Sequence, residues 1–207
     1  MVDDQRLVFP VGQFGGIIRA ETPGPTWFNI RRGDRLWSVE PDPGLLWLHA
    51  HGRTDDPAPT PWTRSAVLGR RGTKRSPADE AADYGQLVGL GLIAEVDPDD
   101  PAAVDFARTY QLVPLAHGMG NSSEDPRRFL AGFPPDLIAT FTWTQWRLWR
   151  ESHLEPSLWD GCRAVAANEE RAGRTLDPRD LLTDTLRGLH VMLGIRLAYL
   201  DVAREDT

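Results

Sequence analysis

The pattern of apolar and polar residues in the first half of the chain predicts a hairpin followed by helices. Residues 28–39 show an extended pattern on either side of a tight turn at 31–34, which is typical of a β-hairpin. A short apolar run over 43–51 predicts a first helix, and residues 62–70 have the length of a second. The first 27 residues are rich in Gly and Pro and are expected to form a loosely structured arm.

A third helix has the clearest start signal in the sequence. Ser76 stands at the N-cap position, Pro77 at the first helical position and Asp79 at the third. Behind this start, residues at the spacing of one buried helix face follow: Tyr84, Leu87, Val88 and Gly91. The helix is therefore expected to begin at Ser76 and to end at one of the glycines that follow.

The segment after this helix predicts a second hairpin. Residues 92–96 are expected to form one strand, 97–101 a turn and 106–113 a second strand. Two short helices, a well-capped third helix and a hairpin follow one another in the order of a winged helix-turn-helix module. The module would span roughly Arg35 to Val113.

The second half of the chain predicts helices. One is expected over about 136–151, a shorter one over about 157–170, and a last one over about 177–203. Leucines recur along the last helix three and four residues apart: Leu182, Leu186, Leu189, Leu193, Leu197 and Leu200. This seam is either the core of a bundle or the interface of a homodimer formed through Leu186, Leu189, Leu193 and Leu197.

These elements divide the chain into three parts. They are an N-terminal arm (1–27), a winged helix-turn-helix domain (28–116) and a helical C-terminal region (117–207) that packs on the domain or dimerises. The expected fold class is α+β and mainly helical.

Two segments resemble known winged-helix families. Residues 84–116, YGQLVGLGLIAEVDPDDPAAVDFARTYQLVPLA, resemble the third helix and wing of MarR-like and PadR-like regulators, in which an apolar helix ends in LGLI and enters the first wing strand. Residues 31–52, RRGDRLWSVEPDPGLLWLHAHG, are similar to the PqqD-like peptide-recognition elements of peptide-modifying pathways. The resemblance implies a winged-helix fold whose ligand is either DNA or a peptide.

The composition is that of a folded protein, with 41% hydrophobic and 26% charged residues. Its single cysteine, Cys162, excludes an internal disulfide and a cysteine-based zinc site. The sequence contains no apolar window of membrane-spanning length and no basic leader followed by an apolar stretch. A cytoplasmic location without membrane contact is therefore expected.

Positive charge is concentrated at one place in a chain with a net charge of -7. Five cations fall within twelve residues that contain no acid: Arg64, Arg70, Arg71, Lys74 and Arg75. A helix-turn-helix passes here into its recognition helix, where Lys and Arg commonly contact phosphates, although the same cluster also fits a solvated loop. Together with Ser76 at the helix start, the cluster predicts binding of double-stranded DNA by a transcriptional regulator, which is the leading interpretation.

The third helix carries the opposite charge. Asp79, Asp83 and Gln86 repeat at i, i+4 and i+7 on the side that a regulator inserts into the major groove. Carboxylates repel phosphates, so this helix is a poor DNA reader. The alternative interpretation is a non-catalytic protein or peptide adaptor, in which an extended peptide adds to the wing sheet and the acids select a basic segment.

A tryptophan-rich segment offers the adaptor a second candidate surface. Trp143 and Trp146 alternate with arginines and have the composition of a surface that grips a peptide, but they equally fit a buried core helix.

No combination of residues indicates catalysis. Cys162 has no specific arrangement with His153 or His190, and His49 and His51 lie two residues apart, which places them on opposite sides of a helix. The chain is expected not to be an enzyme and to have neither a metal ion nor another cofactor.

Overall fold

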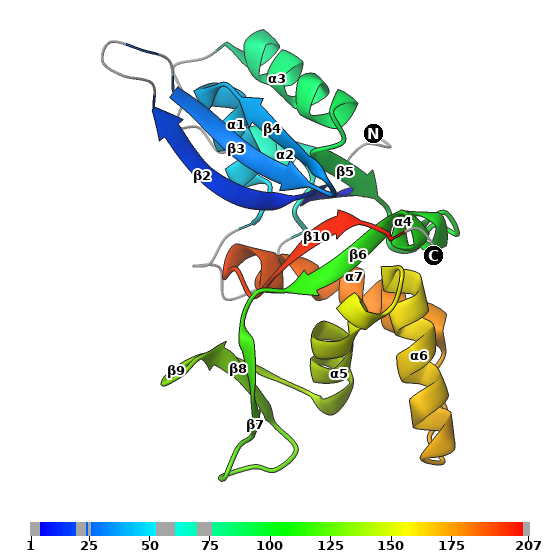
Figure 1. Cartoon of the computed structure of the whole chain (residues 1–207). Helices are drawn as coiled ribbons and strands as arrows, with labels where there is room; N and C mark the ends of the chain where they lie inside the picture. The colour runs from blue at the N-terminus through cyan, green and yellow to red at the C-terminus, as the bar shows by residue number, and fades with distance from the viewer. Residues whose placement is uncertain (1–4, 20–23, 25, 53–60, 70–75, 205–207) are drawn as a thin grey trace.

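A computed structural model of the chain describes residues 5–19, 24, 26–52, 61–69 and 76–204. Within these residues, ten strands form four small antiparallel sheets, and seven α-helices accompany them (Figure 1). The fold is therefore a mixed α/β fold, and the expectation of a mainly helical protein is wrong. Part of the difference lies in the expected loosely structured arm, where residues 7–10 and 13–19 form strands. The rest arises after residue 90, where several segments expected to be helical or wing-like form strands with distant partners.

The N-terminal lobe consists of a three-stranded sheet and the three helices that follow it. The sheet has the order β2 (Gln13–Arg19), β3 (Thr26–Arg32), β4 (Arg35–Val39), and the helices are α1 (Pro41–His49), α2 (Arg64–Leu68) and α3 (Pro77–Gly89). The predicted hairpin over 28–39 and the three predicted helices are confirmed. Their core contains Val8, Phe28, Ile30, Val39, Leu46, Trp47, Ala50, Trp62, Val67, Tyr84, Leu87, Leu92 and Ile93.

Two local features fix the helices of this lobe. A Cβ at Gly44 would lie 2.4 Å from Cγ of Phe28, so glycine at this position lets the Phe28 ring pack directly against α1. At the start of α3, the Ser76 hydroxyl accepts a hydrogen bond from the backbone N–H of Asp79 at 3.2 Å. The predicted N-cap is therefore confirmed.

The predicted wing hairpin is absent from the described structure. β5 (Ile93–Val96) pairs with β1 (Leu7–Pro10), and residues 103–109 form a helix, α4 (Ala103–Thr109). Ala103, Phe106 and Ala107 give α4 a buried face at the i, i+3, i+4 spacing, which the alternation of residues 106–112 obscured. The strand that follows, β6 (Tyr110–Pro114), pairs with β10 (Ala198–Val202) and not with β5.

The C-terminal lobe begins with a three-stranded meander that projects from the rest of the molecule (Figure 1). It consists of β7 (His117–Asn121), β8 (Phe129–Phe133) and β9 (Asp136–Phe141). Three helices follow, α5 (Trp143–Glu151), α6 (Leu158–Arg171) and α7 (Pro178–Gly194), with the short 3-10 helix η1 (Ser152–Leu154) after α5.

Two of the helices expected here are shorter than predicted. The first starts only at Trp143, where Thr142 and Gln145 form a capping box, so the first residues of the expected helix belong to β9. The last ends at Gly194, because Arg196 takes a left-handed conformation (φ 57°) and the chain turns back into β10.

The leucine seam of α7 lies inside the C-terminal lobe. Leu186, Leu189 and Leu193 are at most 1% exposed, and so is Leu197 beyond the helix. They pack in one core with residues from β1, α4, α5, α6 and β10. The expected homodimer interface through these leucines is wrong, since the side chains have no surface left for a partner. No helix of the described residues is long and apolar enough to cross a membrane.

The strand β10 also ties the two lobes together. The Asp201 carboxylate accepts a hydrogen bond from the backbone N–H of Gly33 at 2.7 Å and lies 3.3 Å from Arg31 Nη1. Arg31 Nη2 donates to the Tyr199 hydroxyl at 2.6 Å. The β3–β4 hairpin is thereby held by residues about 168 positions later in the sequence.

Candidate functional site

The residues predicted to contact DNA are only partly within the described chain. Arg70, Arg71, Lys74 and Arg75 lie outside it. Arg64 begins α2, and its guanidinium lies 4.8 Å from the centre of the Tyr84 ring on α3. Ser76 acts as the N-cap of α3 and also donates to the Asp79 carboxylate at 2.8 Å. Both described residues therefore have identified roles in holding α2 and α3.

Helix α3 presents an acidic surface. Asp79 and Gln86 are exposed and Asp83 is half-buried, whereas Tyr84 and Leu87 face the core. The helix carries three acids and no Lys or Arg. The Tyr84 hydroxyl donates to the Glu95 carboxylate on β5, which holds the helix against the strand that follows it.

Among the described residues, strand β4 is an edge strand of the N-terminal sheet. It pairs with β3 from Arg32↔Arg35 to Phe28↔Val39 across a two-residue turn, and it stands last in the order of the sheet. In such a hairpin the closing pair exchanges its hydrogen bonds, and every second residue turns its N–H and C=O outward. The backbone groups of Leu36 and Ser38 therefore point to the open side of β4.

The edges of the other three-stranded sheet and the opposite edge of this one are less regular than β4. The register of β2 shifts between Phe14 and Gly16, that of β7 between Gly118 and Gly120, and that of the β8–β9 pair between Ala131 and Gly132. Bulges bend a strand away from further pairing. The β3–β4 register is continuous, as is that of the largely buried β6–β10 pair, so β4 is the regular edge of the two three-stranded sheets.

The hairpin end of β3 and β4 lies against the turn that follows α3. The Arg32 guanidinium packs against Gly91, where an added Cβ would lie 3.0 Å from Arg32 Cζ. Arg32 Nε and Trp37 Nε1 are buried donors without an acceptor in the described residues. Exposed apolar side chains stand on β4 and on α3, with Leu36 62% and Val88 43% exposed.

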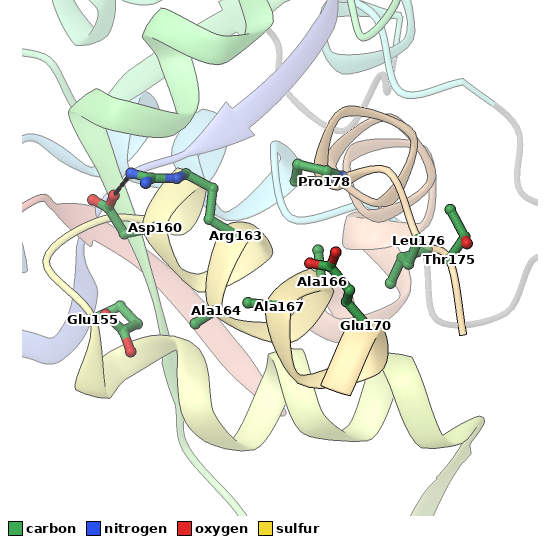
Figure 2. A pocket seen from close by; sticks show the side chains of 10 residues that line it. All are labelled: Glu155, Asp160, Arg163, Ala164, Ala166, Ala167, Glu170, Thr175, Leu176 and Pro178. Carbon is green, nitrogen blue, oxygen red and sulfur yellow. Dashed lines mark hydrogen bonds and ion pairs between the residues drawn. The ribbon is translucent and has the colours of Figure 1, made fainter. Parts of the chain in front are cut away.

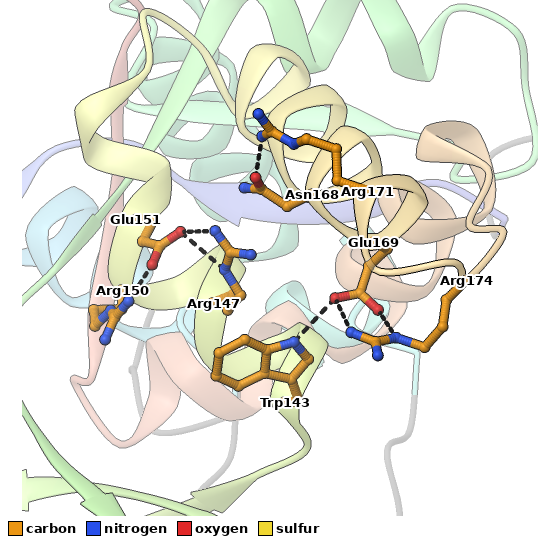
Figure 3. A network of polar contacts seen from close by, with 8 residues as sticks. All are labelled: Trp143, Arg147, Arg150, Glu151, Asn168, Glu169, Arg171 and Arg174. Atoms are coloured by element: carbon orange, nitrogen blue, oxygen red, sulfur yellow. Dashed lines mark hydrogen bonds and ion pairs between the residues drawn. The ribbon is translucent and has the colours of Figure 1, made fainter.

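The tryptophan-rich helix α5 is mainly structural. Trp146 is 7% exposed and packs against Phe129 in a tilted arrangement, with 4.9 Å between ring centres. Trp143 is 37% exposed, and its indole N–H donates to Glu169 at 2.9 Å (Figure 3). The hydrogen bonds from Arg174 and then from Trp143 hold the pKa of Glu169 below its usual value. The core alternative therefore accounts for Trp146, and Trp143 is tied into a polar network.

An open groove of about 640 Å³ lies between α6 and the start of α7 (Figure 2). Alanines 164, 166 and 167 contribute to its wall, and Glu155, Asp160 and Glu170 supply carboxylates. Its one lining cation, Arg163, lies 3.4 Å from Asp160. The lining residues include neither His nor Cys.

Burial favours the neutral forms of two histidines and of the cysteine. Burial lowers the pKa of His51 and of His190 to about 4, and each ring N–H donates to a backbone carbonyl, that of Trp47 and of Val8. Burial raises the pKa of the Cys162 thiol to about 12. Among the described residues, no group of three His, Cys, Asp or Glu side chains is placed to hold a metal ion.

Sequence reasoning placed the acidic helix correctly but attached the peptide to a wing that does not form. The free edge that does exist, β4, was visible in the sequence only as half of a hairpin. No family model, curated protein or solved structure matches the chain.

Proposed function

We propose that this chain is a non-catalytic cytoplasmic adaptor that binds an extended segment of a peptide or protein partner as a fourth strand along β4. The observation that carries the proposal is the regular edge of β4, which pairs with no strand other than β3 among the described residues, in the same lobe as the acidic helix α3. Main-chain hydrogen bonds to Leu36 and Ser38 would supply affinity, and side-chain contacts would supply selectivity.

Charge favours a basic segment as the partner. The acids of α3 raise the local concentration of cations and repel acidic chains. Leu36 on β4 and Val88 on α3 add exposed apolar surface to the same lobe. The acids of α3 repel phosphates and therefore disfavour DNA on that helix.

The test uses the full chain and a fluorescent nine-residue peptide of alternating Lys and Val. The control is a fluorescent peptide of the same length with alternating Glu and Val. We expect the basic peptide to change fluorescence anisotropy saturably and the acidic one not to. Duplex DNA is included at modest salt. DNA binding tighter than about 10⁻⁵ M with no peptide binding would favour the regulator instead.

Two variants at one position isolate the contribution of the backbone. Leu36→Pro removes an outward N–H at an edge position where proline is tolerated, whereas Leu36→Thr removes the same apolar side chain and keeps the N–H. We expect Leu36→Pro to weaken peptide binding about tenfold relative to Leu36→Thr. Equal binding by the two variants would exclude strand addition at β4.

A further inference from the structure

A second candidate site lies in the C-terminal lobe, apart from the β4 edge. A cavity of about 410 Å³ is enclosed by α5, α7 and the end of β9. None of its lining residues belongs to β2–β4 or α1–α3. The volume falls within the range of small-molecule sites in proteins, roughly 300–1,000 Å³.

The floor of the cavity is apolar and rigidly held. Leu112, Trp149 and Met192 line it and are 0%, 1% and 7% exposed. The Trp149 indole N–H donates to the Leu197 carbonyl at 2.9 Å, so the ring is fixed in place. An apolar body entering the cavity would be removed from water without rearrangement of these side chains.

One wall of the cavity carries two carboxylates. Asp180 and Asp184 lie one turn apart on α7, and in the described part of the chain neither has an ion-pair or hydrogen-bond partner. Some other carboxylates of this lobe are paired, as Asp99 is with Arg187 at 2.7 Å. The cavity lining contains no Lys, Arg or His.

The position of the two acids in the helix separates a structural role from a binding role. Asp180 lies in the first turn of α7, where a negative charge stabilises the helix. Asp184 lies one turn further on and lacks that benefit. Like charges at i and i+4 also repel each other, and a cation between them would relieve the repulsion.

We propose that this cavity binds a small organic cation whose apolar body rests on the Trp149 floor and whose ammonium or guanidinium group pairs with Asp180 and Asp184. A carboxylate ligand of the same shape is repelled by this wall, and a neutral one gains no ion pair. The proposal does not depend on the proposed peptide binding at β4.

The test follows the Trp149 indole N–H signal in the NMR spectrum of the full chain, identified with Trp149→Phe. The probes share one apolar body: 4-phenylbutylamine, 4-phenylbutanol and 4-phenylbutyrate. We expect a saturable shift with the amine and binding at least about fivefold weaker with the alcohol. The carboxylate should leave the signal unchanged. The absence of any shift with the amine at millimolar concentration, or equal binding of amine and carboxylate, would refute the proposal.

Variants separate the charge from the cavity. Asp180→Asn combined with Asp184→Asn is expected to weaken amine binding about tenfold, whereas Asp105→Asn, an exposed acid on α4, is the control and should leave it unchanged. Gly188→Leu places a side chain in the cavity, since a Cβ at this position meets no atom within 4 Å. Binding by Gly188→Leu as tight as by the native chain, with its circular dichroism unchanged, would place the amine elsewhere and overturn the assignment.

Discussion

The two lobes of this protein solve the same packing problem in different ways. The N-terminal lobe builds its core from neighbouring segments, with a meander sheet followed directly by three helices. The C-terminal lobe surrounds the leucine face of α7 with elements from many parts of the chain, including β1 from the opposite end of the sequence. The N-terminal lobe leaves a regular strand edge open, and the C-terminal lobe leaves an apolar cavity with a charged wall. In this protein the candidate site of the locally built lobe is a backbone edge, whereas that of the lobe assembled from distant segments is a cavity between helices.

The largest expected effect tests whether the lobes unfold as one unit. Trp47 and Trp149 are each at most 1% exposed, and each indole N–H donates to a backbone carbonyl across its lobe. Trp47→Ala and Trp149→Ala should each lower the free energy of unfolding by about 3–5 kcal/mol. We expect one shared transition in urea, followed by circular dichroism. Two transitions, of which each variant shifts only one, would show that the lobes are independent.

Low pH is expected to destabilise the junction of the lobes, where the His190 ring on α7 forms a hydrogen bond with the Val8 carbonyl on β1. Its folded pKa of about 4 lies below the unfolded value, so the unfolded chain binds protons more readily between these values. The free energy of unfolding should therefore decrease as the pH falls from about 6.5, by roughly 2 kcal/mol at pH 5 for each such histidine. Urea unfolding at several pH values measures this, and His190→Gln should reduce the dependence. A native and a variant chain with the same pH dependence would contradict the assignment.

Two glycines in helices, one in each lobe, should respond in opposite directions. Gly44→Ala inserts a Cβ 2.4 Å from the Phe28 ring and should destabilise the protein by about 2 kcal/mol. Gly188→Ala meets no atom within 4 Å and should stabilise it by up to about 1 kcal/mol through helix propensity. Thermal unfolding distinguishes the two, and a loss of stability in Gly188→Ala would mean that the cavity wall is tighter than described.

The smallest effect compares the two helix caps. Ser76 caps α3 and Thr142 caps α5, and each side chain accepts from the N–H three residues later. Ser76→Ala and Thr142→Ala should each cost about 1 kcal/mol. Each hydroxyl also donates to the side chain three residues later, Ser76 to the Asp79 carboxylate at 2.8 Å and Thr142 to the Gln145 amide oxygen at 3.0 Å. Because a hydrogen bond to a charged acceptor is the stronger, the loss at Ser76 is expected to be the larger of the two, measured by urea unfolding. The reverse order would show that the charge of Asp79 adds nothing to this cap.

The sequence predicted the elements of the N-terminal lobe because their signals are local. The turn at Gly33, the Pro77 start and the Ser76 cap are each decided by neighbouring residues. The wing was predicted wrongly because the partners of β5 and β6 are chosen by distant segments. Nothing near Ile93 or Tyr110 indicates that β1 and β10 will pair with them. Tertiary packing overrides local pattern in such cases.

The candidate sites, too, were predicted where neighbouring residues determine them and missed where distant segments do. The acidic face of α3 follows from helical spacing and was predicted as such. The open edge of β4 was not recognised as a site, because a hairpin pattern does not reveal whether a third strand covers its far side. The cavity beside Asp184 was not predicted at all, since it exists only where β9, α5 and α7 meet.

The hydrogen bond between the Gly33 N–H and the Asp201 carboxylate has a consequence for folding during synthesis on the ribosome. The hairpin that bears β4 is synthesised early, but the residues of β10 that hold it are made about 168 positions later. Domains fold as their segments emerge, N-terminal parts first. During synthesis, the contacts of Asp201 with the β3–β4 hairpin can therefore form only after β10 has been made. A chain interrupted before that strand would contain the β4 edge without these contacts.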